Sequence, residues 1–348
     1  MSQATSVEAH VDRLHQFGTV DMHFDLLMDL YEQRHRSHVL ETDYLADLQA
    51  GGMGVLGVAI YLEDKYLPEM GLRVALGQVA RLYAEVDQSS HFALCRKHSD
   101  IIAARQAGKI ALLITMEGVE PLGTDINLLR VFYELGLRSL GLTHARRNMA
   151  GDGGVFAATG SSPQGLTDFG KEVVKTCETL GIILDLAHLN PAGVDDVLAL
   201  TQRPLMISHT NPRAFYDIER NSSDDQIRVV GQRGGVVGVN AVLVSPRQED
   251  SHLDRYVDHI EYVAELAGID NIGIGFDFFE HIYRQWTAEQ KAELEGRLTK
   301  VYFLPELSTH AQARNLTRKL IERGFNDSDI EKILYGNWLR LFKAGLAG

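Results

Sequence analysis

Eight short apolar runs, rich in valine, isoleucine, leucine and glycine, recur along the chain of 348 residues. They lack polar–apolar alternation, which is typical of parallel strands that are covered on both faces. Helical patterns separate the runs, and several end in glycine, as helices often do. The predicted strands are residues 18–24, 54–61, 110–117, 138–144, 181–188, 204–209, 235–240 and 271–277. This alternation, without a nucleotide-binding fingerprint, predicts an α/β fold of the (β/α)8 or TIM-barrel type.

Three segments exceed the eight repeats. Residues 25–42 and 278–305 follow the first and last predicted strands, and we expect them to be long loops that wall a pocket at the carboxyl end of the barrel. The pattern in residues 308–344 predicts two helices packed outside the barrel. No repeat, low-complexity tract or linker interrupts the sequence, so we predict one domain over residues 1–348 with its core at about 18–343.

Composition excludes several classes of protein. A net charge of −13 disfavours a nucleic-acid surface, because phosphate binding depends on lysine and arginine. No apolar run approaches the length of a membrane span, and the first residues lack a signal-peptide pattern. Two cysteines, Cys95 and Cys177, make a disulfide framework unlikely to be the basis of the fold. We therefore expect a cytoplasmic protein with neither a membrane nor a nucleic acid as partner.

Most of the apolar runs end in an ionisable residue. In a barrel of this type the carboxyl ends of the strands meet at one rim, where catalytic groups converge. A single histidine at a strand end is more often structural, but four of the fourteen histidines stand at such ends, together with two acids. The residues at or next to strand ends are His23, Asp25, Glu117, His144, His188, His209 and Asp277. This pattern predicts a metal-dependent hydrolase.

Five of these residues form two candidate sets of metal ligands. His23 and Asp25 are two residues apart, so on a strand their side chains point to the same face. Glu117 has two oxygens and can bridge two cations about 3.5–4 Å apart; the alternative is an acid in the first turn of a helix. The predicted sets are His23, Asp25 and Glu117 for one ion, and Glu117, His188 and His209 for the other. Nitrogen and oxygen ligands without thiolate suit zinc best, with manganese, cobalt or iron as alternatives.

Ten segments of the sequence resemble the membrane (renal) dipeptidase family of metallopeptidases, in the amidohydrolase superfamily, over about residues 18–343. They include VDMHFDLL, ITMEGVEPLG, LGLRSLGLTHARRNMAGDG, GIILDLAHL, PLMISHTNPRAF, ERNSSDDQIRVV and IGIGFD. The resemblance implies two zinc ions bridged by a glutamate, with His23, Asp25, Glu117, His188 and His209 as ligands. It also implies that His144 and Arg220 bind a small dipeptide, that Asp277 is catalytic, and that the C-terminal residue of the substrate can be a D-residue. A homodimer is a further implication.

The chemistry of three residues fits these roles, although each has a simpler alternative. Asp277 can shuttle a proton, or it is a structural acid at a strand end. His144 can donate a hydrogen bond to the oxyanion, or it binds backbone at the rim. Arg220 can bind the substrate α-carboxylate, or it is a solvated loop residue. The family often reads GDFDG where this chain has FDFFE, which leaves the side-chain preference of the pocket open.

Two other functions compete with dipeptide hydrolysis. A related amidohydrolase would act on a cyclic amide, a lactone or a β-lactam, and it would not need a free substrate carboxylate. A metal-binding scaffold without turnover would lack a ligand or the shuttle acid, and the sequence retains all of them.

Overall fold

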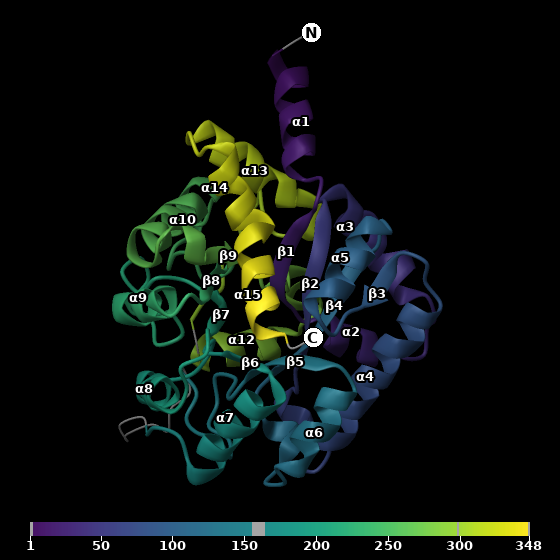
Figure 1. The fold of residues 1–348 in the computed structure, drawn as a ribbon, viewed down its shortest axis with the longest axis vertical. Helices are drawn as coiled ribbons and strands as arrows, with labels where there is room; N and C mark the ends of the chain where they lie inside the picture. The colour runs from purple at the N-terminus through teal and green to yellow at the C-terminus, as the bar shows by residue number, and fades with distance from the viewer. Residues whose placement is uncertain (1–2, 155–163, 298, 347–348) are drawn as a thin grey trace.

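The computed structural model describes residues 3–154, 164–297 and 299–346, and it contains a barrel of parallel strands surrounded by helices (Figure 1). Every pairing between neighbouring strands is parallel. The strands are β1 Thr19–Phe24, β2 Met53–Ile60, β3 Phe92–Leu94, β4 Ile110–Glu117, β5 Leu137–Gly141, β6 Ile183–Asp185, β7 Met206–Thr210, β8 Val236–Val239 and β9 Ile272–Ile274.

Pairing between β2 and β4 closes the sheet into a barrel of eight strands. The same pairings run from β1 to β9 and then down through β8, β7, β6 and β5 to β4. The predicted TIM-type barrel is therefore confirmed. It brings the carboxyl ends of strands that are up to 250 residues apart in sequence to one rim.

The ninth strand, β3, was not predicted from the sequence. Its three residues pair with Ile110, Ala111 and Leu112 at the start of β4, whereas β5 pairs with β4 from Ile114 onward. Both strands therefore use the same edge of β4, one after the other. β3 is only partly buried, unlike the equally short β6 and β9, so no continuous apolar run marks it in the sequence.

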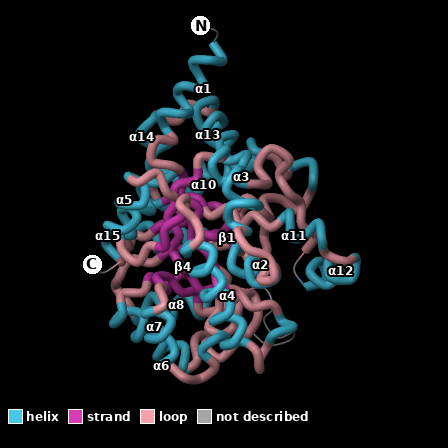
Figure 2. Tube along the Cα trace, turned by 90° about the vertical axis from the view of Figure 1, so that its right-hand side faces the viewer, coloured by secondary structure: helices cyan, strands magenta, loops and turns pink. Residues whose placement is uncertain are grey.

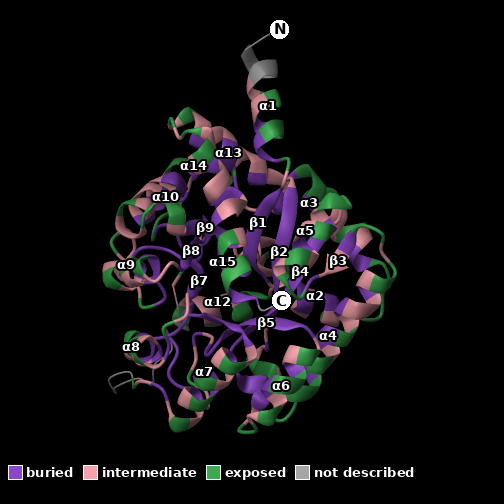
Figure 3. Ribbon diagram, viewed as in Figure 1, coloured by how far each residue is buried: buried purple, intermediate pink, exposed green. Residues whose placement is uncertain are grey.

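Side chains on alternate positions of the strands build two layers of core. The interior of the barrel contains Val20, Val55, Leu113 and Met206, and Trp338 fills its amino-terminal end. The indole Nε1 of Trp338 donates a hydrogen bond to the carbonyl of Ile274 (3.1 Å). A larger core lies between the barrel and the outer helices, so the strands are buried on both faces while the helices expose one (Figure 3).

The helices follow the strands and cover the barrel on the outside (Figure 1). They are α1 Gln3–Leu14, α2 Leu26–Glu32, α3 Leu45–Ala50, α4 Gly71–Asp87, α5 His98–Gln106, α6 Asn127–Glu134, α7 Asp168–Leu180, α8 Pro191–Leu200, α9 Asp224–Gln232, α10 Leu253–Ala267, α11 Glu280–Gln285, α12 Ala288–Arg297, α13 Ala313–Glu322, α14 Asp327–Glu331 and α15 Asn337–Gly345. The two helices predicted at the C-terminus correspond to α13 and to a second stretch in which a π-helical turn joins α14 to α15. Among the described residues, no helix is long and apolar enough to cross a membrane.

The two segments predicted as long loops contain helices instead. Residues 25–42 hold α2, and residues 278–305 hold α11 and α12. On α11, His281 lies against Phe24 at the end of β1, with ring centroids 6.4 Å apart. Figure 2 shows α2 and α11 on the same side of the barrel. The expectation that both segments lie at the carboxyl rim is therefore met, although loop was the wrong structure for them.

Candidate metal centre

Only part of the predicted site lies on strands. His23 lies on β1, Glu117 is the last residue of β4, and His209 lies on β7. Asp25 directly follows β1, before the first residue of α2. At Gly118 the backbone has a φ of +91°, which lets the chain turn away immediately after Glu117.

Three predicted residues lie beyond the strands to which they were assigned. β5 ends at Gly141, β6 at Asp185 and β9 at Ile274, so His144, His188 and Asp277 are in the loops that follow. The predicted strand ends were wrong because the residues that continue each run, such as Leu186 and Phe276, are as buried as the strands.

His188 and Asp277 have left-handed backbone conformations, with φ of +62° and +59°. Non-glycine residues are uncommon in this region, although aspartate and histidine adopt it more often than most, and residues in such conformations cluster at functional sites. The carbonyl of His188 accepts a hydrogen bond from the amide of Gly154 (2.7 Å). Two residues later, Asn190 caps α8 by accepting from the amide of Gly193 (3.1 Å), which fixes the loop that carries His188.

The first predicted set of ligands meets at the ends of β1 and β4. Nε2 of His23 lies 3.6 Å from Oδ1 of Asp25 and 3.7 Å from Oε1 of Glu117. Oδ1 of Asp277 lies 3.9 Å from the same nitrogen. Three carboxylates therefore surround one imidazole.

The second set is at least as compact. Oε1 of Glu117 lies 2.9 Å from Nε2 of His188 and 3.5 Å from Nε2 of His209. The two imidazole nitrogens are 3.0 Å apart. Glu117 thus belongs to both sets, as a carboxylate that bridges two cations would.

The charges in the site favour bound cations. Burial raises the pKa of Glu117 to about 8, and the nearby Asp25 and Asp277 add to this effect while His23 opposes it. Burial by itself would lower the pKa of His23, but the carboxylates of Glu117, Asp25 and Asp277 outweigh it and raise that pKa to about 10. The negative charges around His23 are therefore strong enough to stabilise a positive charge there. Burial lowers the pKa of His188 and of His209, which keeps both imidazoles neutral and able to bind metal.

The donor atoms fit a pair of transition-metal ions. A tetrahedral ion with ligands at about 2.0–2.1 Å separates neighbouring donors by roughly 3.3 Å. The separations within the two sets bracket this value, from 2.9 Å to 3.7 Å. Oδ1 of Asp25 is buried and has no hydrogen-bond partner among the described residues. Such an atom is costly to bury unless something else, such as a cation, contacts it.

Asn240 is a site residue that we did not predict from the sequence. It follows β8, and its Nδ2 donates a hydrogen bond to Oδ2 of Asp277 (3.0 Å). Burial raises the pKa of Asp277 to about 6, and the nearby Asp25 adds to this shift; His23, Arg220 and the hydrogen bond from Asn240 oppose it. The sequence carried only a weak signal, an amide at the end of a predicted strand.

A second group that we did not predict supports His209 from behind. Nδ1 of His209 lies 2.7 Å from Oγ of the neighbouring Ser208. Oδ1 of Asp185 accepts hydrogen bonds from the amides of Ser208 (2.8 Å) and Ala187 (3.0 Å). Such contacts to the outer ring nitrogen fix the tautomer and the orientation of a ligating histidine.

His144 packs against the second set of ligands. Its ring centroid lies 4.5 Å from that of His188 and 4.7 Å from that of Tyr61, which directly follows β2. Burial lowers the pKa of His144, and the neighbouring Arg146 and Arg220 act in the same direction. His144 is therefore a neutral imidazole that can donate a single hydrogen bond. Tyr61 is a further neighbour of the site that we did not predict.

Arg220 is 6% exposed, so the solvated-loop alternative is wrong. Its Nη2 donates a hydrogen bond to the carbonyl of His209 (3.2 Å). Burial lowers the pKa of Arg220, while Asp277, Glu117 and Asp185 counteract this effect. A guanidinium has five N–H groups, and among the described residues this is the hydrogen bond that Arg220 donates, so it retains donors for an anion.

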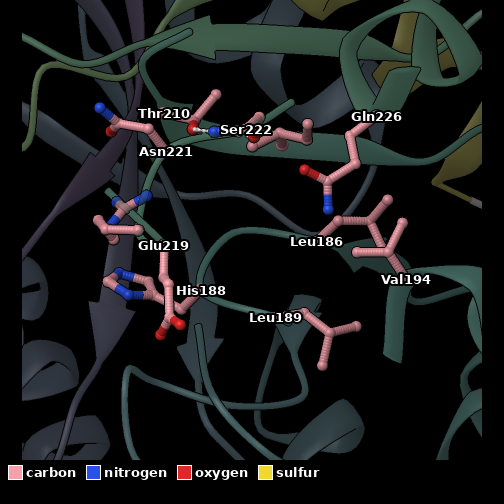
Figure 4. A pocket seen from close by; sticks show the side chains of 11 residues that line it. Leu186, His188, Leu189, Val194, Thr210, Glu219, Asn221, Ser222 and Gln226 are labelled. Atoms are coloured by element: carbon pink, nitrogen blue, oxygen red, sulfur yellow. Dashed lines mark hydrogen bonds between the residues drawn. The ribbon is translucent and has the colours of Figure 1, made fainter. Parts of the chain in front are cut away.

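Arg220 is also among the residues that line a small pocket, and His188 lines the same pocket (Figure 4). Leu186, Leu189 and Val194 form one side of the pocket. The arginine and a candidate metal ligand therefore face the same space.

Comparison with known proteins gives a consistent result. The profile of the membrane dipeptidase family, peptidase family M19, matches residues 8–289. Dipeptidase tcpJ of Claviceps purpurea is 26% identical over 272 residues, which are 77% of this chain and 57% of that protein. An uncharacterized dipeptidase of Schizosaccharomyces pombe is 30% identical over 285 residues, which are 74% of this chain and 68% of that protein. The match thus spans less than two thirds of the Claviceps protein.

Two solved structures are similar over nearly their whole length. The structure described as dipeptidase AC, a metallopeptidase of family M19, has a TM-score of 0.82 and 26% identity, and the match covers 96% of this chain and 100% of that one. A metallopeptidase from Rhodobacter sphaeroides, solved with a phosphinate mimic of the dipeptide L-Ala-D-Ala, has a TM-score of 0.81 and 25% identity, covering 94% and 99%. Together with the family profile, which spans most of the chain, these likenesses show that the chain belongs to the membrane dipeptidase family, peptidase family M19.

Proposed function

We propose that this protein is a metal-dependent dipeptidase that hydrolyses the peptide bond of free dipeptides with two divalent cations, zinc in the first place. One observation carries the proposal: two compact sets of donor atoms share Glu117 and lie beside Asp277 and Arg220. Family membership makes peptide hydrolysis the chemistry to expect of such a site. Manganese, cobalt and iron suit the same donors and are alternatives to zinc.

The proposed ligands are His23, Asp25 and Glu117 for one cation, and Glu117, His188 and His209 for the other. Two cations bound there would polarise the scissile carbonyl and make a bound water nucleophilic near neutral pH. Asp277 accepts the proton of the attacking water and delivers it to the leaving amine, because it begins ionised beside two cations.

Two further residues position the dipeptide. His144, as a neutral imidazole, donates a hydrogen bond to the oxyanion of the tetrahedral intermediate, an interaction that is commonly worth about 3–4 kcal/mol. Arg220 binds the α-carboxylate through two parallel hydrogen bonds. This contact limits the part of the substrate after the scissile bond to one residue, because the carboxylate lies at this distance only from the last peptide bond of a peptide.

We also propose that a D-residue is accepted at the C-terminal position. The support is the Rhodobacter sphaeroides structure, whose ligand mimics L-Ala-D-Ala and whose fold matches this chain over 94% of its length. We further propose that the protein is cytoplasmic, that its partner is a dipeptide substrate, and that it can form a homodimer.

The test is a screen of L-Xaa-L-Xaa and L-Xaa-D-Xaa dipeptides with protein of measured metal content. We expect hydrolysis that a chelator abolishes and that zinc restores. The variant Glu117→Gln should lose bound metal and turnover together, whereas Glu134→Gln, at an exposed position on α6, should lose neither. Failure to hydrolyse any dipeptide with two metal ions bound would refute the proposal.

Blocked substrates separate the proposal from its enzymatic alternative. A dipeptidase of this kind should cleave C-terminal amides poorly. An amidohydrolase for cyclic amides, lactones or β-lactams would cleave a substrate that lacks a free carboxylate, and the change Arg220→Ala would leave its rate unaltered.

A further inference from the structure

A small apolar cluster lies beside Asp277 and Arg220, separate from the main core. Three of its residues are buried, with exposed fractions of 2–6%, and four partly buried residues pack against them. We call this cluster the apolar wall, and it consists of Val242, Leu243, Val301, Ile218, Phe279, Leu294 and Phe303. These residues come from several separate parts of the chain, so the wall exists only in the folded protein.

Two residues of the wall, Phe279 and Val242, lie close to Asp277, the proposed proton-transfer group. Phe279 is two residues beyond Asp277. Val242 is two residues beyond Asn240, and its amide donates a hydrogen bond to Oδ1 of Asn240 (2.6 Å). The same asparagine donates to Asp277 (3.0 Å). The backbone of the wall and the carboxylate of Asp277 are therefore held in one hydrogen-bonded unit.

A third residue joins the wall to the arginine. Ile218 is two residues before Arg220, and its carbonyl accepts a hydrogen bond from the amide of Asn221 (3.0 Å) in the turn that carries the arginine. The wall therefore borders both groups that would hold the C-terminal half of a dipeptide.

Four aromatic side chains line the outer part of this region, and each is only half-buried. The ring of Phe303 lies 5.3 Å from that of Phe279 and 5.4 Å from that of Tyr283, and Tyr283 lies 5.6 Å from Trp286. Edge-to-face pairs of this kind form a stiff apolar surface that retains area for another apolar group.

The acid that follows Phe279 does not oppose this character. The carboxylate of Glu280 accepts a hydrogen bond from Nη2 of Arg284, one turn later on α11 (2.8 Å). The charge of Glu280 is therefore offset within the helix. Of the two neighbours Phe279 and Glu280, Phe279 is the one that belongs to the apolar wall.

The stereochemistry of a dipeptide selects what the wall contacts. In the proposed function the leaving nitrogen lies at Asp277 and the α-carboxylate at Arg220, so the Cα of the C-terminal residue, bonded to both, lies between these two residues. Its side chain is a third substituent on the same carbon and is therefore within reach of a surface that borders both groups. We infer, resting on the proposed function, that the enzyme prefers dipeptides whose C-terminal side chain is apolar, and that Phe279 and Val242 determine this preference.

The kinetic test compares L-Ala-Xaa dipeptides that end in glycine, leucine, phenylalanine, aspartate or lysine. We expect kcat/KM to be at least about tenfold higher for leucine and phenylalanine than for aspartate and lysine, the discrimination that a modest apolar contact gives. Phe279→Ala should lower the value for leucine and phenylalanine at least about threefold more than the value for L-Ala-Gly, mainly through KM. Phe325→Ala is the matched control, because Phe325 is a half-buried phenylalanine in the turn between α13 and α14.

A binding measurement tests the contact without turnover. The chain has two tryptophans, and Trp338 is fully buried whereas Trp286 stands beside the wall. A phosphinate dipeptide mimic with a leucine side chain should change the fluorescence of the metal-loaded protein, and Trp286→Phe should abolish the change. A change that persists in Trp286→Phe would overturn the contact.

The outcomes distinguish this inference from the proposed function. Equal rates on dipeptides ending in aspartate, lysine and leucine would overturn the apolar preference and leave dipeptide hydrolysis intact. Hydrolysis of none of the five dipeptides would overturn the proposed function itself.

Discussion

Replacing Arg220 by methionine should remove recognition of the substrate carboxylate while keeping the length of the side chain. Arg220 is 6% exposed, so water cannot take over the lost hydrogen bonds easily. A bidentate contact consists of two charge-assisted hydrogen bonds, each worth at least about 1.5 kcal/mol. Their sum of about 3 kcal/mol corresponds to a loss of roughly a hundredfold in kcat/KM, at about 1.4 kcal/mol per factor of ten.

The assay compares L-Ala-L-Leu with L-Ala-L-leucinamide by following the release of alanine. The wild-type protein should prefer the free dipeptide by about the same hundredfold, and Arg220→Met should erase most of that preference. Arg220→Lys should fall between the two, because lysine keeps the charge but not the planar fork. Arg213→Met is the matched control: Arg213 lies in the same segment, and its guanidinium pairs with Asp217 (2.7 Å).

The result that would refute this reasoning is an equal loss on the free dipeptide and on the amide. Nη2 of Arg220 donates a hydrogen bond to the carbonyl of His209, which is a proposed metal ligand. If the substitution displaced His209, activity would fall on every substrate. Metal analysis separates the two cases, because recognition of the carboxylate requires no change in bound metal.

Three further predictions concern proton transfer, metal binding and acid stability. Asn240→Ala should move the acidic limb of the kcat profile to higher pH, because its hydrogen bond lowers the pKa of Asp277; an unmoved limb would contradict the proton-transfer role. Chelation should lower Tm by roughly 5 °C, since a ligand at a hundred times its Kd stabilises by about 2.7 kcal/mol, and zinc should restore it in a thermal-shift assay. Burial lowers the pKa of His15 in the folded protein from 6.5 to about 4, so the unfolded state binds more protons between these values and stability falls with decreasing pH. Between pH 7 and pH 4 the free energy of unfolding, measured with urea, should fall by about 3 kcal/mol less in His15→Gln than in the wild-type protein. An equal fall in both proteins would contradict burial of a neutral imidazole.

The barrel could be predicted because its strands are buried on both faces, which gives continuous apolar runs rather than alternation. The same signal misplaced the strand ends. Leu142, Leu186 and Phe276 lie beyond their strands and are nonetheless buried, because the first residues of the rim loops pack under the site. Hydrophobic runs indicate burial, and at this rim the buried residues continue beyond the last hydrogen bond between neighbouring strands.

The predicted ligands were visible because an imidazole or a carboxylate interrupts an apolar run. Asn240, Ser208 and Tyr61 gave no such signal, since neutral polar and aromatic residues are ordinary at strand ends and turns. The contacts of Asn240 with Asp277 and of Tyr61 with His144 depend on different strands that the folded barrel brings together, whereas Ser208 contacts its sequence neighbour His209 on β7.

Closure of the barrel and assembly of the candidate metal centre depend on the same residue, Asp21. The two strands β1 and β9 pair at Asp21 and Ile274, and beyond β9 the amide of Asp277 donates a hydrogen bond to the carbonyl of His23 (3.3 Å). The carboxylate of Asp21 adds further contacts: Oδ1 accepts from the amides of His23 (3.2 Å) and Phe276 (2.8 Å), and Oδ2 lies 2.8 Å from Nε2 of His310. The two amides belong to a proposed ligand and to the residue before Asp277. A fully buried acid therefore joins the two halves of the candidate site, and the arrangement of the proposed ligands at the rim depends on how β1 and β9 meet below it.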